Sequence, residues 1–258
     1  MIVDKKEFDN FISILPDLEK DEVFFISLSA RNKYLTKEER EHYCLGRTEM
    51  FSRSIVKRKD QFSYIMKKLK ASLIYKTTKN DSNIPEKALV CYSNINPSSM
   101  LKAYSMLLDE MNKETYEVTK ALMEKRAPNY DGIIHLERKL MNCIQKSRSR
   151  KYFVDVDFDT YNFDYVAEFL NDYLVECPYH IIKTHGGYHL LLHPSAITGG
   201  ELFYKKISFL NEKVKNEGGE VTINKNQMVP VPGTNQAGIL VKIVTVPAVL
   251  KKTDNPFD

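Results

Sequence analysis

The sequence predicts an α+β fold with a ferredoxin-like core in residues 146–250. Apolar residues alternate with period two in several short runs, and they recur at helical spacing in the segments between those runs. From residue 153 onward the predicted elements follow the order strand, helix, strand, strand, helix, strand. This βαββαβ order is the ferredoxin-like pattern, which RNA-recognition modules also use.

Turn and helix-stop residues set the limits of these elements. Pro178 ends the first helix, Gly186 and Gly187 join two strands into a hairpin, and Gly218 ends the second helix. The predicted elements are a strand at 153–159, a helix at 161–177, strands at 179–184 and 188–193, a helix at 201–216 and a strand at 220–223.

Residues 1–145 are expected to form a mainly helical amino-terminal lobe with one or more strands, one of them near residues 89–94. Its clearest helix is the amphipathic stretch 98–122, and residues 124–132, which contain a proline and a glycine, are expected to link two lobes. Residues 251–258 are expected to be a tail. The 258 residues are enough for one unit, 1–258, of two packed lobes.

Three aspartates crowd one face of the first predicted strand of the core. Period two places Asp155, Asp157 and Asp159 together, with apolar residues between them. Like charges repel one another unless cations neutralise them, and hard divalent ions prefer oxygen ligands. The sequence therefore predicts a metal–carboxylate site. A solvated edge strand is the alternative, which the flanking Phe and Val residues disfavour.

His189 lies on the hairpin strand that is expected to share a sheet with these acids. A histidine on the same face as Asp155 and Asp157 can bind a phosphate or orient a substrate. The alternative is a histidine satisfied within the core. The turn at Gly186 and Gly187 favours the site, because glycine lets a backbone or a phosphate approach closely.

The order of these motifs resembles the archaeo-eukaryotic primase superfamily, the primase-polymerases of archaea, eukaryotes, plasmids and phages. The resemblance spans roughly residues 88 to 245. Four segments carry it: VDVD at 154–157 as the first motif, THGGYH at 184–189 as the second, MVPVPGT at 228–234 after the third, and a strand ending in Asn-Pro at 90–97.

This resemblance implies a DNA primase or primase-polymerase that performs template-directed, two-metal nucleotidyl transfer on single-stranded DNA in phage or plasmid replication. Asp155 and Asp157 would hold Mg²⁺ or Mn²⁺. His189 would contact the phosphates of the incoming nucleoside triphosphate. The other residues assigned to nucleotide binding are Lys183, Thr184 and Gly187. A separate replicative helicase is the expected partner.

One motif departs from the family's pattern. The third motif normally supplies another metal-binding Asp before the Pro-Gly-Thr segment, but residues 222–228 contain Asn224 and Asn226 instead. Glu220 is the nearest acid. Either the site works with two acids, or Glu220 substitutes for the third, or catalysis is reduced.

Basic residues are unevenly placed, although the net charge is only +4. They are interleaved with aromatic residues over 47–76, and a second cluster at 146–151 leads into the acidic strand. Such patterns suit a phosphate backbone and stacked bases, although a solvated helix face is the ordinary alternative. The residues expected to contact nucleic acid are Lys57, Arg58, Arg148, Arg150 and Lys151.

Two other functions stay open. A catalytically weakened protein that binds nucleotides or single-stranded DNA is favoured by the missing third acid. A rolling-circle initiator or relaxase is disfavoured, because His189 and His193 do not have the spacing of its metal-binding pair. Four widely separated cysteines, the absence of a signal peptide and the absence of a membrane-length apolar run predict a cytoplasmic protein without a membrane partner.

Overall fold

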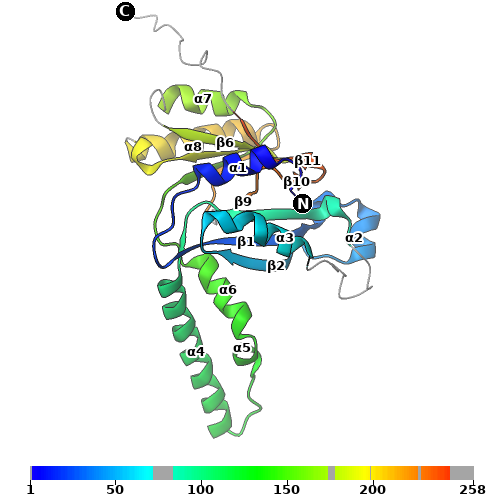
Figure 1. Cartoon of the computed structure of the whole chain (residues 1–258), viewed down its shortest axis with the longest axis vertical. Coiled ribbons are helices and arrows are strands. Elements are labelled where there is room, and N and C mark those ends of the chain that lie inside the picture. The colour runs from blue at the N-terminus through cyan, green and yellow to red at the C-terminus, as the bar shows by residue number, and fades with distance from the viewer. Residues whose placement is uncertain (1, 72–83, 174–177, 198, 226–227, 245–258) are drawn as a thin grey trace, which may run out of the picture.

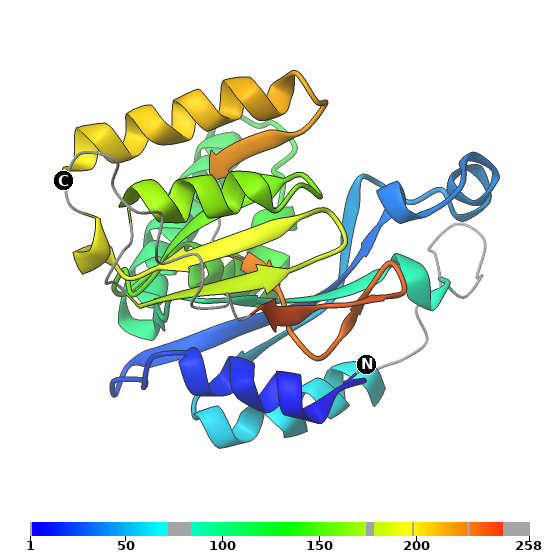
Figure 2. The same ribbon diagram turned by 90° about the horizontal axis from the view of Figure 1, so that it is seen from above.

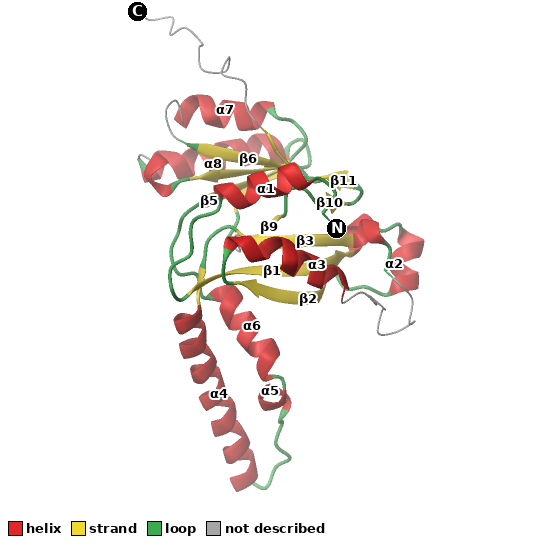
Figure 3. Cartoon of the chain, viewed as in Figure 1, coloured by secondary structure: helices red, strands yellow, loops and turns green. Residues whose placement is uncertain are grey.

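The computed structural model describes residues 2–71, 84–173, 178–197, 199–225 and 228–244. These residues form a mixed α+β structure in which all named strand pairs are antiparallel. Two sheets lie one above the other, and a pair of helices projects away from them (Figures 1 and 3). Cys177 and the expected tail at 251–258 lie outside the described residues.

The second sheet along the chain contains the predicted core. Its strand order is β12-β6-β7-β5-β8, and the predicted order of strands and helices within residues 153–223 is confirmed. The elements are β5 (Val154–Asp159), α7 (Asp164–Tyr173), β6 (Tyr179–Lys183), β7 (Tyr188–Leu192), α8 (Gly200–Lys215), β8 (Glu220–Ile223) and β12 (Lys242–Val244).

Helices α7 and α8 cover one face of this sheet (Figure 2). The apolar residues of β5, which are Val154, Val156 and Phe158, pack there with Phe169 and Leu210 of the two helices. Because successive side chains of a strand point to opposite faces, this packing turns the aspartates of β5 toward the other sheet.

The amino-terminal part contains more sheet than the sequence predicted. Its sheet has the order β2-β1-β3-β9, with a short strand β4 beside β1. The strands are β1 (Glu22–Arg31), β2 (Thr48–Val56), β3 (Leu89–Asn94), β4 (Ser98–Ser99) and β9 (Met228–Pro230). Of these strands, the sequence located only β3. Strand β1 is buried on both faces over Glu22–Ala30, so its sequence lacks the alternation that marks a half-exposed strand.

The two faces of β1 have different partners. Phe24 and Ile26 face a core shared with helices α1 and α3, whereas Val23 and Phe25 pack against the base of the projecting helices. The helices of this part are α1 (Lys5–Ile14), α2 (Lys37–Tyr43), α3 (Phe62–Ala71), α4 (Met100–Met123), α5 (Asp131–Ile134) and α6 (Leu136–Lys146).

The expected link between lobes at residues 124–132 is instead the turn of a helical hairpin. Helix α4 leads away from the sheets, and α5 and α6 return along it (Figure 1). Ala103 and Leu107 of α4 pack with Ile144 of α6. In the part of the chain described above, no helix combines the length and the apolar character needed to cross a membrane.

The chain passes repeatedly between the two sheets, so residue 145 is not a boundary between separate lobes. Strand β9 returns to the first sheet, β12 returns to the second, and a small hairpin of β10 (Asn235–Gln236) and β11 (Ile239–Leu240) lies between them in sequence. Asn96 ties the end of β3 to the segment before β5. Its Oδ1 accepts from the backbone N–H groups of Tyr152 and Phe153 at 2.6 Å each, and its Nδ2 donates to the Phe153 carbonyl at 2.9 Å.

Candidate functional site

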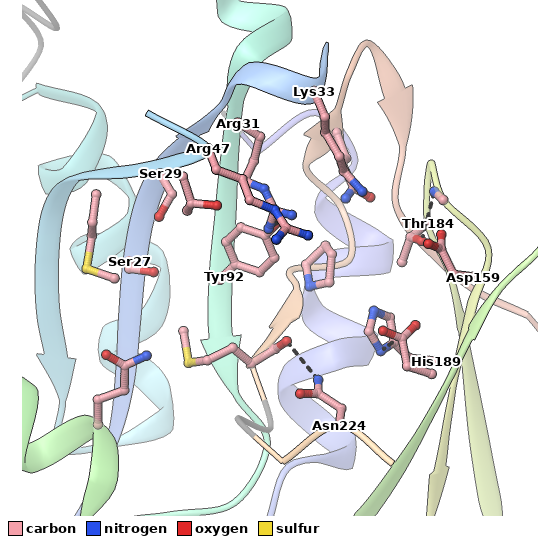
Figure 4. Close-up of a pocket in the computed structure, with 18 residues that line it drawn as sticks. Ser27, Ser29, Arg31, Lys33, Arg47, Tyr92, Asp159, Thr184, His189 and Asn224 are labelled. Atoms are coloured by element: carbon pink, nitrogen blue, oxygen red, sulfur yellow. Dashed lines mark hydrogen bonds and ion pairs between the residues drawn. The ribbon is translucent and has the colours of Figure 1, made fainter. Parts of the chain in front are cut away.

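A cavity of about 440 Å³ lies between the two sheets. One wall comes from the first sheet and its adjoining loops, and the other comes from β5, β7 and the turns beside them (Figure 4). The first wall includes Ser27, Ser29, Arg31, Lys33, Arg47 and Tyr92, and the second includes Asp157, Asp159, Thr184, Gly186 and His189. A row of cations thus faces a row of acids.

The aspartates of β5 lie on one face, as the alternation predicted, but at different depths. Asp155 is only 1% exposed. The Asp157 side chain is 39% exposed, and Asp159 is exposed at the rim of the cavity. The carboxylates that line the cavity are therefore Asp157 and Asp159, whereas Asp155 lies behind them.

His189 is brought beside the acids, as predicted. It lies opposite Asp157 in the β5–β7 register. Its Nδ1 is 3.1 Å from each carboxylate oxygen of Asp155 and 3.7 Å from Oδ1 of Asp157. Burial alone would lower the pKa of His189, but the charges of Asp155 and Asp157 outweigh it and raise that pKa to about 9. The imidazolium then acts as an internal counter-charge for these carboxylates.

Asn224 occupies the other side of Asp155. Its Nδ2 donates to Oδ2 of Asp155 at 2.7 Å, and its backbone N–H donates to the Asp155 carbonyl at 2.9 Å. The residue next to Asp155, directly after the end of β8, is thus an amide. Glu220 is exposed at the start of β8, opposite Asp159, and does not line the cavity. Asn226 lies outside the described residues.

The acid wall fits a hard divalent cation that completes its shell with substrate and water. Burial raises the pKa of the Asp157 carboxyl, and Asp155 and Asp159 add to this effect, so a bound cation would relieve an unfavourable concentration of negative charge. Within the described ranges, no group of three or more His, Cys, Asp and Glu side chains is placed to hold a metal ion by itself. Mg²⁺ commonly needs only one or two carboxylates when phosphate oxygens and waters supply the remaining ligands.

Of the cationic wall, the sequence indicated only Arg47, at the start of the basic cluster 47–76. Arg31 donates from Nη1 to the Tyr92 hydroxyl at 3.0 Å and lies 5.9 Å from the centroid of that ring. Its Nε is buried and has no hydrogen-bond partner among the residues that the structure describes. Lys33 and Arg47 line the same side of the cavity. The available signal was the alternation of polar residues Ser27, Ser29 and Arg31 along an otherwise apolar run.

Of the other residues predicted to bind nucleotide, only Thr184 lines the cavity. Lys183 pairs with Tyr188 on the helix-covered side of the sheet, with its Nζ 5.9 Å from the Tyr188 ring centroid. Gly187 has φ +152°, and a Cβ there would lie 1.9 Å from the Phe158 carbonyl oxygen. The close approach that requires glycine is therefore that of β5 itself.

The predicted nucleic-acid contacts are dispersed. Lys57, Arg148 and Lys151 are exposed, and Arg58 forms an exposed ion pair with Asp60. Arg150 forms an ion pair within the fold. Its Nε and Nη2 each lie 3.1 Å from the carboxylate of Glu22, whose side chain is fully buried. Residues 72–76, at the end of the basic cluster, lie outside the described residues.

Replacing Arg150 with alanine is expected to lower the free energy of unfolding by about 3 kcal/mol, because it leaves the buried Glu22 carboxylate without its partner. Lys151→Ala removes a neighbouring exposed cation and is the matched control, with an expected change below about 0.5 kcal/mol. Urea unfolding of both variants measures the difference. Equal stability of the two variants would contradict the structural role of Arg150.

The chain was compared with protein-family models, curated proteins and solved structures, and none of them matches it. The function is therefore inferred from the geometry of the cavity. His193 is the second histidine of the pair considered in the sequence. Its Nδ1 forms a hydrogen bond with Oγ of Ser195 at 2.7 Å, and no ion pair joins it to the acids of β5 among the described residues.

Proposed function

We propose that the chain is a metal-dependent nucleotidyltransferase of the primase-polymerase type, acting with nucleoside triphosphates on a single-stranded DNA template. One observation carries the proposal: a carboxylate wall faces a cationic wall across a cavity of about 440 Å³. Polyphosphate needs cations from the protein, and the reacting phosphate needs divalent ions held by carboxylates. The cavity offers both at once.

The topology supports the same proposal. The βαββαβ order and the antiparallel strand order β6-β7-β5-β8 agree with a ferredoxin-like core, and the acids lie on its central strand β5. The end of β3, where the resemblance places an Asn-Pro element, is tied to the entry of β5 through Asn96. The segments that resemble primase motifs thus surround one cavity. Fold alone does not assign function, so the site carries the argument.

The roles follow from position. Asp157 would hold the divalent cation, with Asp155 and Asp159 supplying further negative charge. When bound, Mg²⁺ or Mn²⁺ would neutralise the triphosphate and activate the 3′-hydroxyl. Arg31, Lys33 and Arg47 would bind the outer phosphates from the opposite wall. His189 orients the two inner carboxylates and lines the cavity beside them.

The direct test is incorporation of labelled nucleotide on a primed and an unprimed single-stranded template, with Mg²⁺ and Mn²⁺ compared. Both metals are expected to support incorporation, and chelation with EDTA is expected to abolish it. Purified protein without any metal-dependent incorporation would refute the transferase proposal.

A second candidate function is supported by Asn224. An amide hydrogen-bonded to Asp155 occupies the place where a third carboxylate would strengthen the metal site. Under this alternative the chain is a replication protein that binds nucleotide or single-stranded DNA with weak catalysis or none. Nucleotide binding without incorporation in the preceding assay would favour it.

Asn224→Asp is expected to increase Mn²⁺ affinity on the order of tenfold, because ligand charge sets the affinity of carboxylate sites. Without metal the variant should melt at a lower temperature than wild type, since two carboxylates would then adjoin each other. Thermal melting against Mn²⁺ concentration measures both effects. Asn224→Ala is the control, which removes the hydrogen bond without adding charge. Identical metal dependence in the aspartate and alanine variants would place the cation elsewhere.

A further inference from the structure

A second cavity, of about 330 Å³, adjoins the first and shares Lys33, Asp159 and Gly186 with it. Its remaining lining comes from the loop after β5, the β6–β7 turn, the turn before β8 and Tyr34. The two cavities therefore meet at the outermost carboxylate of β5. Whatever binds in the second cavity lies next to the site proposed for the triphosphate.

Aromatic side chains define this second cavity. The rings of Tyr34 and His185 have centroids 5.1 Å apart at an interplanar angle of 64°. Gln236 fixes both: its Nε2 donates to the Tyr34 hydroxyl at 2.6 Å, and its Oε1 accepts from the His185 backbone N–H at 2.9 Å. Tyr161 also lines the cavity and is 68% exposed, so one face of its ring is open to a ligand.

Gly218 and Gly219, which have no side chains, also line this cavity. Gly218 has φ +82°, and a Cβ on Gly219 would lie 2.4 Å from the Asp159 carbonyl oxygen, so this turn packs closely on the end of β5. A cavity lined by aromatic rings and by bare backbone suits a flat ring.

The two cavities carry different charges. In the proposed reaction the two nucleotides also differ, because one carries a triphosphate and the other supplies a 3′-hydroxyl. The first cavity has Arg31, Lys33 and Arg47, which suit a polyphosphate. The second has Lys33 alone, together with Asp159 and Glu217, which would repel a polyphosphate. Its ligand must be aromatic and carry little negative charge.

We propose that the second cavity binds the base of the nucleotide that supplies the attacking 3′-hydroxyl, by stacking against Tyr161 and His185. This inference depends on the proposed transferase function. In the reaction the 3′-oxygen forms a bond to the α-phosphorus of the triphosphate in the first cavity. The bond from that phosphorus to the bridging oxygen breaks, pyrophosphate leaves, and the hydroxyl proton passes to water. The shared rim at Asp159 places the two reactants side by side.

The test measures binding, not turnover. Fluorescence anisotropy gives the dissociation constant of a short primer–template whose 3′-terminal primer residue is either a normal nucleotide or an abasic one. Stacking on an aromatic side chain predicts that the abasic end binds wild type about tenfold more weakly. The same abasic change should have little effect on Tyr161→Ala, which already lacks the ring, and the full effect on Tyr161→Phe, which keeps it.

Three controls make the result specific. An abasic residue at the 5′ end of the primer should not alter affinity. Tyr161→Ala should keep the melting temperature of wild type, because Tyr161 is largely exposed. Tyr116→Ala removes a similarly exposed tyrosine from α4, distant in the fold from both cavities, and should retain the full effect of the abasic 3′ end. Equal loss in wild type and Tyr161→Ala, or no loss in wild type, would overturn the proposal.

The attacking nucleotide can come from a primer end or from a free nucleoside triphosphate. If Tyr161→Ala reduces extension alone, the cavity serves the primer end. If it also reduces dinucleotide formation on an unprimed template, the cavity serves the first nucleotide as well. If it reduces neither, the inference is wrong. Failure of the proposed function is distinguishable, because it would abolish incorporation in wild type while leaving the abasic-end comparison measurable.

Discussion

Replacing Asp157 with asparagine is expected to lower nucleotide incorporation on the order of 10³-fold or more. The substitution removes a cavity-facing carboxylate that would hold the cation, and a metal ion at a transferring phosphate supplies several kcal/mol of transition-state stabilisation. Asparagine has nearly the same shape, and removing one of three neighbouring carboxylates relieves repulsion. The melting temperature should therefore be unchanged or slightly higher. Single-turnover incorporation and a thermal melt of the same preparation measure the two quantities.

Asp109→Asn is the matched control, because Asp109 is exposed on the helical hairpin. It should leave incorporation unchanged. Near-normal activity of Asp157→Asn would refute the assignment of the metal site. Asp155→Asn tests the buried position: activity should fall there too, but with a lower melting temperature, since the hydrogen-bonded set with His189 and Asn224 loses its charged member.

Replacing Arg31 with alanine is expected to weaken nucleoside triphosphate binding by about 10- to 100-fold. A hydrogen bond to a charged group contributes about 1.5–3 kcal/mol, and the Arg31 guanidinium lines the cavity where the outer phosphates are proposed to bind. Isothermal titration with nucleotide and Mg²⁺ measures the change. Arg31→Lys should recover only part of the affinity, because lysine lacks the planar fork that lies against Tyr92.

Lys183→Ala is compared with Arg31→Ala in the same measurement of nucleotide affinity. The sequence assigned Lys183 to the nucleotide, whereas the structure directs it to the Tyr188 ring on the far side of the sheet. Unchanged affinity in Lys183→Ala together with weaker binding in Arg31→Ala would support the cavity geometry. The reverse pattern would show that the sequence assignment was right.

The difference between Lys183 and Arg31 shows what the sequence could and could not predict. Alternation along β5 and β7 placed Asp155, Asp157 and His189 on one face, because side-chain direction in a strand is a local property. How deeply each aspartate is buried is not a local property, because it depends on Asn224 and on the opposite sheet. Arg31 belongs to a strand that is buried on both faces, so the alternation of Ser27, Ser29 and Arg31 does not show that one face borders a cavity. Its distance from Asp157 is set by tertiary packing.

The two walls of the cavity are tied together, because the buried side chain of Asn96 hydrogen-bonds to the backbone before β5, and β9 pairs with β3 of the first sheet. A site built in this way is preorganised: the conformational entropy of fixing its walls is lost during folding and not during binding. Binding of the proposed nucleotide would then not be opposed by an open–closed equilibrium. Amide hydrogen exchange in β3, β5 and β9 should consequently be slow before any nucleotide is added.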